Sequence, residues 1–154
     1  MITYRKAQIA DVPVLRAMLQ ALSDHDGGSY SVGSEQSLRD HGFGARPLFC
    51  AAIAEKGATA MGMVIFYPDY STHRGQPGIC VQDIFVDDTA RGEGIGRGLL
   101  AVMLQMQDWG AEYITLGVSA DNAKAQAFYD KIGFSARGYE VKILTGAKLD
   151  ALRS

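Results

Sequence analysis

The sequence predicts a mixed α/β fold, with one central β-sheet and helices on both of its faces. Short apolar runs alternate with segments of helical apolar spacing, in the order strand, two helices, three strands, helix, strand, helix, strand. The chain has 154 residues and is 47% hydrophobic, which provides for one sizeable core. Repeats, linkers and low-complexity segments are absent from the sequence. We therefore expect a single domain over residues 1–154.

The N-terminal part of the chain predicts a strand and two helices. Residues 3–7 have the pattern of a short strand. Asp11 and Pro13 then mark a helix start, because aspartate caps a first turn and proline is tolerated within it. The helical spacing ends before residues 24–28, which are polar and glycine-containing and are expected to form a loop. A second short helix is expected over residues 34–40.

The middle of the chain predicts a hairpin and a further strand. Apolar runs at 48–54 and 61–67 flank a turn and are expected to pair with each other. The next strand covers residues 79–86 and is apolar except for Gln82 and Asp83. Two polar residues in the middle of a buried strand indicate a functional role.

The last third of the chain predicts two helices and two strands. A helix over 94–109 is followed directly by a strand over 113–118. A second helix covers 122–132 and is ended by Gly133, and a last strand is expected over 140–144.

Composition argues against several classes of partner. Fifteen Lys and Arg residues against seventeen Asp and Glu residues give a net charge of −2, so no basic surplus indicates nucleic acid or an anionic membrane. The sequence shows neither a signal-peptide pattern nor an apolar stretch long enough to span a membrane, which favours a cytoplasmic protein. Cys50 and Cys80 lie far apart, without a CxxC pattern or a nearby His cluster, so we expect reduced thiols and no metal site.

The strongest functional signal is the glycine-rich turn at residues 91–98, which reads Arg-Gly-Glu-Gly-Ile-Gly-Arg-Gly. Its glycines leave backbone amides unobstructed at the start of a helix, where amides and the helix dipole together bind phosphate. Isolated glycines often serve only tight turns and close packing, but four in so short a run favour phosphate binding. The spacing fits neither a dinucleotide fold nor a P-loop. The expected phosphate-binding residues are Arg91, Gly92, Glu93, Gly94, Ile95, Gly96 and Arg97.

The spacing Arg91-x-x-Gly94-x-Gly96 resembles the acetyl-CoA signature of the GNAT superfamily of N-acetyltransferases. The preceding strand residues 83–86 and the following segment Asn122-x-x-Ala125-x-x-Phe128-Tyr129-x-x-x-Gly133-Phe134 resemble the family's flanking motifs. Further segments at 41–49, 70–75 and 139–149 resemble the diamine (spermidine/spermine) and thialysine-type acetyltransferases. The resemblance implies the GNAT fold, acetyl-CoA as cosubstrate, a small amine substrate and a homodimer.

The resemblance also implies roles for individual residues around the cosubstrate. The strand backbone at Ile84, Phe85 and Val86 would bind the pantetheine arm, because an amide-rich extended arm suits an unpaired strand edge. Tyr129 would protonate the departing thiolate, and a phenol of ordinary pKa near ~10 is able to do so. The alternative for Tyr129 is an aromatic core residue. The residues implied to contact the cosubstrate from the last helix are Asn122, Ala125 and Tyr129.

The amine must lose a proton before it attacks, and the candidate base is Asp83. The diamine enzymes carry a Glu-Asp pair where this chain has Gln82 and Asp83, and Gln82 can hydrogen-bond an amine but cannot accept its proton. The alternative for Asp83 is a structural role, such as capping an amide or pairing with a basic neighbour. His25 and Asp26 match the family's Tyr-Glu pair that lines the amine pocket. Cys80 is expected to share a strand face with Gln82, which leaves a covalent acetyl-enzyme as an alternative.

Three functions remain open at this point. The first is a small-molecule N-acetyltransferase that acts by direct transfer in a ternary complex. The second is a CoA-binding regulatory module of the same fold, favoured by the neutral Gln82. The third is an acetyltransferase that acts on a protein or peptide amine. The apolar residues of the segment 139–149 exceed what one strand needs to cover, which favours the homodimer.

Overall fold

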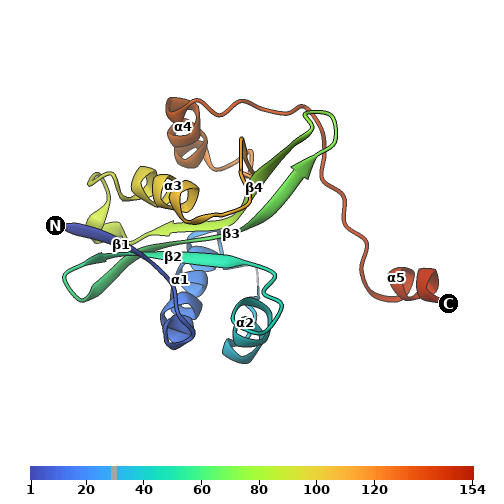
Figure 1. Ribbon diagram of the computed structural model, residues 1–154, viewed down its shortest axis with the longest axis horizontal. Coiled ribbons are helices and arrows are strands. Elements are labelled where there is room, and N and C mark those ends of the chain that lie inside the picture. Colours follow the sequence, from blue (N-terminus) through green and yellow to red (C-terminus); the bar gives the residue numbers. More distant parts are fainter. Residues whose placement is uncertain (29–30) are drawn as a thin grey trace. The chain divides into compact units, whose positions relative to one another are not determined.

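The computed structural model describes residues 1–28 and 31–154. The chain divides into two compact units, Met1–Gly117 and Val118–Ser154. The first unit contains the whole β-sheet and three of the helices (Figure 1). The second unit contains the other two helices.

Five strands form one mixed sheet in the order β1-β2-β3-β4-β5. Strands β1 to β4 pair antiparallel with their neighbours, and β5 runs parallel to β4. The sheet order therefore repeats the chain order. The strands are β1 (Ile2–Lys6), β2 (Cys50–Lys56), β3 (Thr59–Ser71), β4 (Gln76–Val86) and β5 (Ile114–Leu116).

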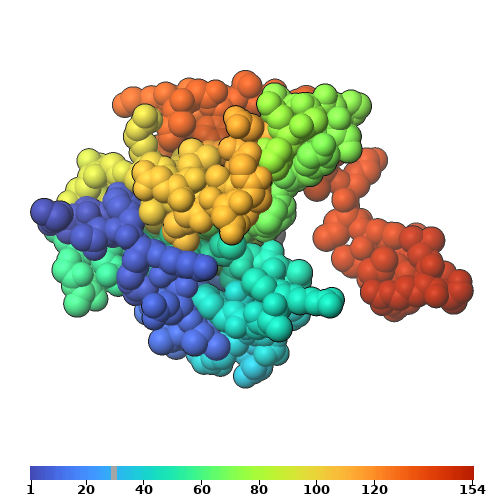
Figure 2. Space-filling view, in the orientation of Figure 1, coloured from blue at the N-terminus to red at the C-terminus, as the bar shows by residue number. Residues whose placement is uncertain are grey.

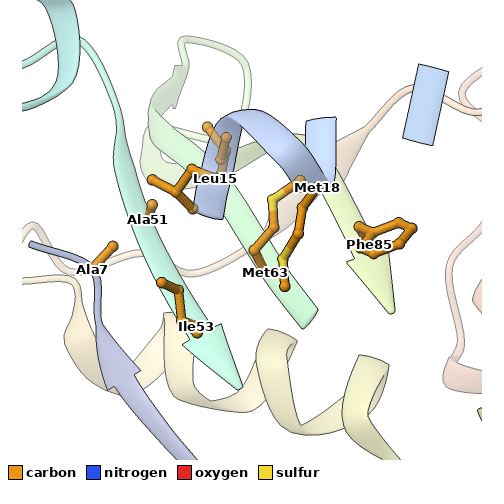
Figure 3. Close-up of a cluster of buried hydrophobic side chains, with 8 residues drawn as sticks. Ala7, Leu15, Met18, Ala51, Ile53, Met63 and Phe85 are labelled. Atoms are coloured by element: carbon orange, nitrogen blue, oxygen red, sulfur yellow. The ribbon is translucent and has the colours of Figure 1, made fainter. Parts of the chain in front are cut away.

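Helices cover both faces of this sheet, as the sequence predicted (Figure 1). The helices of the first unit are α1 (Val12–His25), α2 (Glu35–Gly42) and α3 (Ile95–Met106). On one face, Leu15 and Met18 of α1 pack with Ile53 of β2, Met63 of β3 and Phe85 of β4 in a buried cluster (Figure 3). This cluster joins α1 to three neighbouring strands and holds the helix against the sheet next to β4.

On the opposite face, α3 packs very close to the sheet. A side chain at Gly62 of β3 would press against Ile95 and Leu99 of α3. A side chain at Gly98 of α3 would overlap the hydroxyl of Tyr4 on β1, and Figure 2 shows the N-terminal strand bordering the surface of α3. The last glycine of the 91–98 run therefore serves packing rather than a ligand.

Helix α1 starts where the sequence predicted, with Pro13 in its first turn, but its capping bond and its end differ from the prediction. Asp11 occupies the N-cap position, but its side chain makes no capping bond to α1. Its carboxylate instead accepts hydrogen bonds from the Gln8 amide at 2.7 Å and from Arg5, and the Arg5 guanidinium lowers the pKa of Asp11. The helix also continues to His25, so His25 lies in the last helical turn rather than in a loop.

The second unit contains α4 (Ala123–Ile132) and α5 (Gly146–Arg153). Gly133 ends α4 at φ 120°, as predicted. The strand predicted over 140–144 is wrong: this segment is in no strand of the described chain, and Val141 and Ile143 are 90% and 87% exposed. Apolar alternation shows only that a segment is suited to pairing, whereas a strand also requires a partner for its backbone hydrogen bonds.

Candidate active site

The glycine-rich turn leads directly into α3 and leaves an open space above its backbone. Gly92 and Gly94 adopt positive φ angles of 84° and 77°, which glycine reaches without strain. A Cβ atom built on either residue would meet no other atom within 4 Å. Ile95 is buried in the core, so only its backbone amide is available to a ligand. The turn therefore offers amides at the N-terminus of a three-turn helix, facing open space.

Charged residues hold this turn on both sides. The Arg91 Nε atom lies 2.8 Å from Asp88 Oδ1, which leaves the terminal guanidinium nitrogens of Arg91 for another partner. Glu93 Oε1 lies 3.1 Å from the Nζ atom of Lys56, at the end of β2. Arg97 is exposed on the first turn of α3. The predicted phosphate site thus has two exposed arginines and a backbone with room for an anion.

Strand β4 has an unpaired edge close to this turn. The pairing of β4 with β5 covers only Ile79 to Val81 of β4, opposite Ile114 to Leu116. Within the described chain, the edge of β4 on the β5 side lacks a strand partner over residues 82–86. This stretch contains the predicted pantetheine-binding residues Ile84, Phe85 and Val86. Their backbone groups are suited to bind an extended, amide-containing arm.

A β-bulge explains the two polar residues of β4. Asp83 pairs with Ile65 of β3 and Val81 pairs with the next residue, Phe66, so Gln82 is an extra residue without a partner in the register. The side chain of Gln82 is exposed, while Asp83 is partly buried. Strand β4 is therefore not uniformly buried, and the bulge directs Gln82 out of the ladder.

The bulge also changes which residue shares a face with Cys80. Cys80 pairs with Tyr67 and Asp83 pairs with Ile65, and these two β3 residues lie on the same face because they are two apart. An uninterrupted alternation would place Asp83 on the face opposite Cys80, so it is the bulge that brings Asp83 to the Cys80 face.

Asp83 lies in an environment that favours its protonated form. Burial raises the pKa of the Asp83 carboxyl, and the negative charge of Asp26 raises this pKa further. Asp26 is the residue that ends α1, and the ring of its neighbour His25 lies 6.2 Å from the ring of Phe85 on β4. The structure thus brings His25 and Asp26 to the same side of β4 as Asp83.

Sequence reasoning missed Tyr67, which lies opposite Cys80 and two residues from Ile65, the partner of Asp83. The Cys80 thiol and the Tyr67 hydroxyl form a hydrogen bond over 3.0 Å, and this contact is the main factor that raises the pKa of Tyr67 to about 12. The register of β3 with β4, which places Tyr67 opposite Cys80, is the signal that could have identified Tyr67. Both cysteines are free thiols in the structure.

The remaining predicted residues belong to the second unit and are described within it. The Asn122 side chain accepts a hydrogen bond from the Ala125 amide over 3.1 Å and so caps α4, which accounts for the spacing of these two residues. Tyr129 is buried, with its ring 5.3 Å from that of Phe128 and 5.5 Å from that of Phe134. Burial raises the pKa of Tyr129, which keeps the phenol protonated at neutral pH.

Within residues 1–28 and 31–154, no three His, Cys, Asp or Glu side chains are grouped so that they could hold a metal ion. The helices of this part of the chain are all too short or too polar to cross a membrane.

Comparison with known families decides the class of the protein. The model of the acetyltransferase (GNAT) family matches residues 15–134, from α1 to just beyond α4. The chain belongs to the GNAT acetyltransferase family. The fold, the family and the acetyltransferase class predicted from the sequence are therefore confirmed.

The similarity to several known proteins covers most of this GNAT chain. Thialysine N-epsilon-acetyltransferase from Sus scrofa is 31% identical over 139 residues, which cover 84% of this chain and 81% of that protein. An integron cassette protein from V. cholerae has a TM-score of 0.79 at 20% identity, over 99% of this chain and 97% of the other. An aminoglycoside acetyltransferase from an uncultured soil sample, solved with sisomicin, has a TM-score of 0.74 at 16% identity, over 96% and 97%. At these identities the solved structures show a common fold.

Proposed function

We propose that this GNAT enzyme transfers the acetyl group of acetyl-CoA to a primary amine of a small cationic substrate, either a polyamine or a lysine-like molecule. The observation that carries the proposal is that Asp83 of β4 is partly buried on the side of the sheet where α1 ends in Asp26, so that burial and then the charge of Asp26 raise the pKa of Asp83. A cationic substrate between them would relieve their repulsion. The similarity to a thialysine N-epsilon-acetyltransferase supports the same class of substrate.

The residues of the first unit fit acetyl-CoA as the cosubstrate. The open space above Gly92 and Gly94, the exposed Arg91 and Arg97, and the amides at the start of α3 suit the pyrophosphate. The unpaired edge at residues 84–86 of β4 suits the pantetheine arm. Bound acetyl-CoA supplies the acetyl group, and the turn and the strand edge position it.

Proton transfer is assigned to two residues. Asp83 accepts the proton of the substrate ammonium, directly or through water, and its raised pKa makes it a stronger base than an ordinary aspartate. Gln82, exposed at the bulge, orients the amine through its amide group. Tyr129 donates a proton to the departing thiolate, and its raised pKa keeps that proton available at neutral pH. We assign these roles for direct transfer of the acetyl group from acetyl-CoA to the amine in a ternary complex, without an acetyl-enzyme.

A substrate panel tests this function. Purified enzyme is incubated with acetyl-CoA and, in separate reactions, with spermidine, thialysine, free amino acids, an aminoglycoside and a short peptide with a free N-terminus. Released CoA is the readout. We expect the fastest release with spermidine or thialysine, because both carry a second positive charge for Asp26.

The other outcomes of this panel separate the alternatives. Release with the peptide alone would indicate an enzyme that acts on protein amines. Binding of acetyl-CoA without turnover of any amine would indicate a regulatory module. Either result would contradict the proposed substrate class.

We also propose that the enzyme is a homodimer. Tyr139, Val141 and Ile143 are apolar, alternate along the chain and are exposed in the single chain. Light scattering at micromolar concentration should give twice the 16.6 kDa of one chain. Val141→Asp should shift the protein to a monomer, because a buried carboxylate at the interface is costly. The control is Lys142→Asp, at the adjacent residue outside this apolar alternation, and it should remain dimeric. A monomeric wild type would contradict the proposal.

A further inference from the structure

A single carboxylate, that of Asp88, contacts both halves of the proposed site. Its Oδ1 atom lies 2.8 Å from Arg91 Nε in the glycine-rich turn. Its Oδ2 atom lies 3.4 Å from the Nε2 atom of His25, the last residue of α1. Arg91 belongs to the cosubstrate side and His25 to the amine side. The sequence reasoning assigned no role to Asp88.

The backbone that carries Asp88 is held firmly. Asp88 begins a short 3-10 turn (Asp88–Ala90) directly after β4. The preceding Asp87 carboxylate accepts hydrogen bonds from the amide and the hydroxyl of Thr89, over 2.9 and 2.6 Å. The Asp87 amide donates to the Met61 carbonyl over 2.8 Å, and Ala90 is fully buried. The turn is thus fixed to the sheet, and the Asp88 side chain extends from a rigid support.

The contact with Asp88 leaves the two terminal guanidinium nitrogens of Arg91 available for a ligand. Asp88 contacts the Nε atom, so the two terminal nitrogens of the guanidinium remain for a phosphate. An arginine held at Nε loses less conformational freedom when it binds an anion than a free arginine would. A phosphate bound by Arg91 would in turn restrict Asp88, and through Asp88 the end of α1.

We propose that Asp88 is a positioning residue that couples the two half-sites, so that binding of acetyl-CoA at the glycine-rich turn orders the end of α1, which carries His25 and Asp26. This inference rests on the proposed function, because it requires Arg91 to bind the cosubstrate. Its consequence is that the amine pocket is more ordered in the enzyme that already holds acetyl-CoA. The coupling is modest, because all three side chains are partly exposed to solvent.

Hydrogen exchange with acetyl-CoA as the only added ligand tests the coupling. In the wild type, saturating acetyl-CoA should slow amide exchange both in residues 90–97 and in residues 20–28. In Asp88→Asn, which keeps the side-chain shape and removes the charge, residues 90–97 should still be protected but residues 20–28 should not. We expect the Kd for acetyl-CoA to rise only about two- to fivefold in this variant, as is typical for loss of an exposed ion pair.

Asp150→Asn is the matched control. Asp150 is also an exposed aspartate that pairs with an arginine three residues later, with its carboxylate 2.6 Å from Arg153 Nη1. This variant should show the wild-type exchange pattern. With the amine that the panel shows to be acetylated fastest, Asp88→Asn should raise the KM for the amine while kcat changes less than about twofold.

The possible failures of this experiment are distinguishable. If acetyl-CoA does not protect residues 90–97 of the wild type, the cosubstrate site itself is wrong. If residues 90–97 are protected but 20–28 are not, or if Asp88→Asn retains protection of 20–28, the site stands and the coupling is wrong. Tighter binding of acetyl-CoA to Asp88→Asn would also overturn the proposal, because it would show that Asp88 only competes with phosphate for Arg91.

Discussion

In Tyr129→Phe, kcat is expected to fall by about 10²- to 10⁴-fold while the affinity for acetyl-CoA is unchanged, as for the loss of a general acid. The substitution removes only the hydroxyl. The ring contacts with Phe128 and Phe134 are kept, so α4 should retain its packing. Steady-state kinetics and calorimetric titration with acetyl-CoA measure the two quantities separately.

Tyr139→Phe is the control for this variant. Tyr139 is a tyrosine of the same unit, but it is exposed and has no proposed role in proton transfer. Its kcat should equal that of the wild type. If Tyr129→Phe also retains full kcat, Tyr129 is a core aromatic residue and the acid must be sought elsewhere.

In Asp83→Asn, kcat/KM for the amine is expected to fall by about 10²- to 10⁴-fold at neutral pH, because the variant cannot accept a proton. The difference should narrow as pH approaches the amine's own pKa, about 10.4 for a lysine-like group, because the substrate then arrives deprotonated. In the wild type, the acidic limb of the pH profile should lie above the usual aspartate range, because burial and Asp26 raise the pKa of Asp83. Initial rates across pH 5–10 test both statements.

The Asp83 carboxylate should lower the stability of the folded protein at neutral pH, although it raises the rate of the reaction. A folded-state pKa above the unfolded value means that the folded protein binds this proton more tightly, so the free energy of unfolding falls as pH rises through the ordinary aspartate pKa toward the raised one. Asp83→Asn should therefore be more stable than the wild type at neutral pH, with the difference shrinking in acid. Asp40→Asn, at an exposed residue of α2, should change neither rate nor stability appreciably. An Asp83→Asn enzyme with full activity at neutral pH would contradict its role as the base.

The sequence predicted the parts of this enzyme that depend on local pattern. The glycine run, the α3 that follows it and the hairpin of β2 and β3 are each encoded by neighbouring residues, and each was found. The strand predicted at 140–144 failed because pairing depends on a partner that local alternation does not contain. The end of α1 was misplaced because helix ends are set by tertiary packing as much as by polar residues.

The candidate site shows the same division. Arg91, Gly92 and Gly94 could be proposed from the sequence, because the spacing of the glycines determines which backbone amides are unobstructed. The bulge at Gln82 could not be predicted in this way, because an extra residue is recognised only when the register of two strands is known. The contact of Asp88 with His25 joins positions far apart in the chain, and no local pattern predicts it.

The order of the sheet has a consequence for how the enzyme is made. Because strand order equals chain order, every strand that emerges during synthesis finds its neighbour already present. The first unit can close as soon as Gly117 is available, and domains tend to fold from the N-terminus during translation. The strands that carry Asp83 and the glycine-rich turn thus precede α4 along the chain, so this part of the sheet can assemble first. Under the proposed roles, a chain at that stage carries the proposed phosphate site and the proposed base, but neither the cosubstrate contacts proposed for α4 nor Tyr129, the proposed acid.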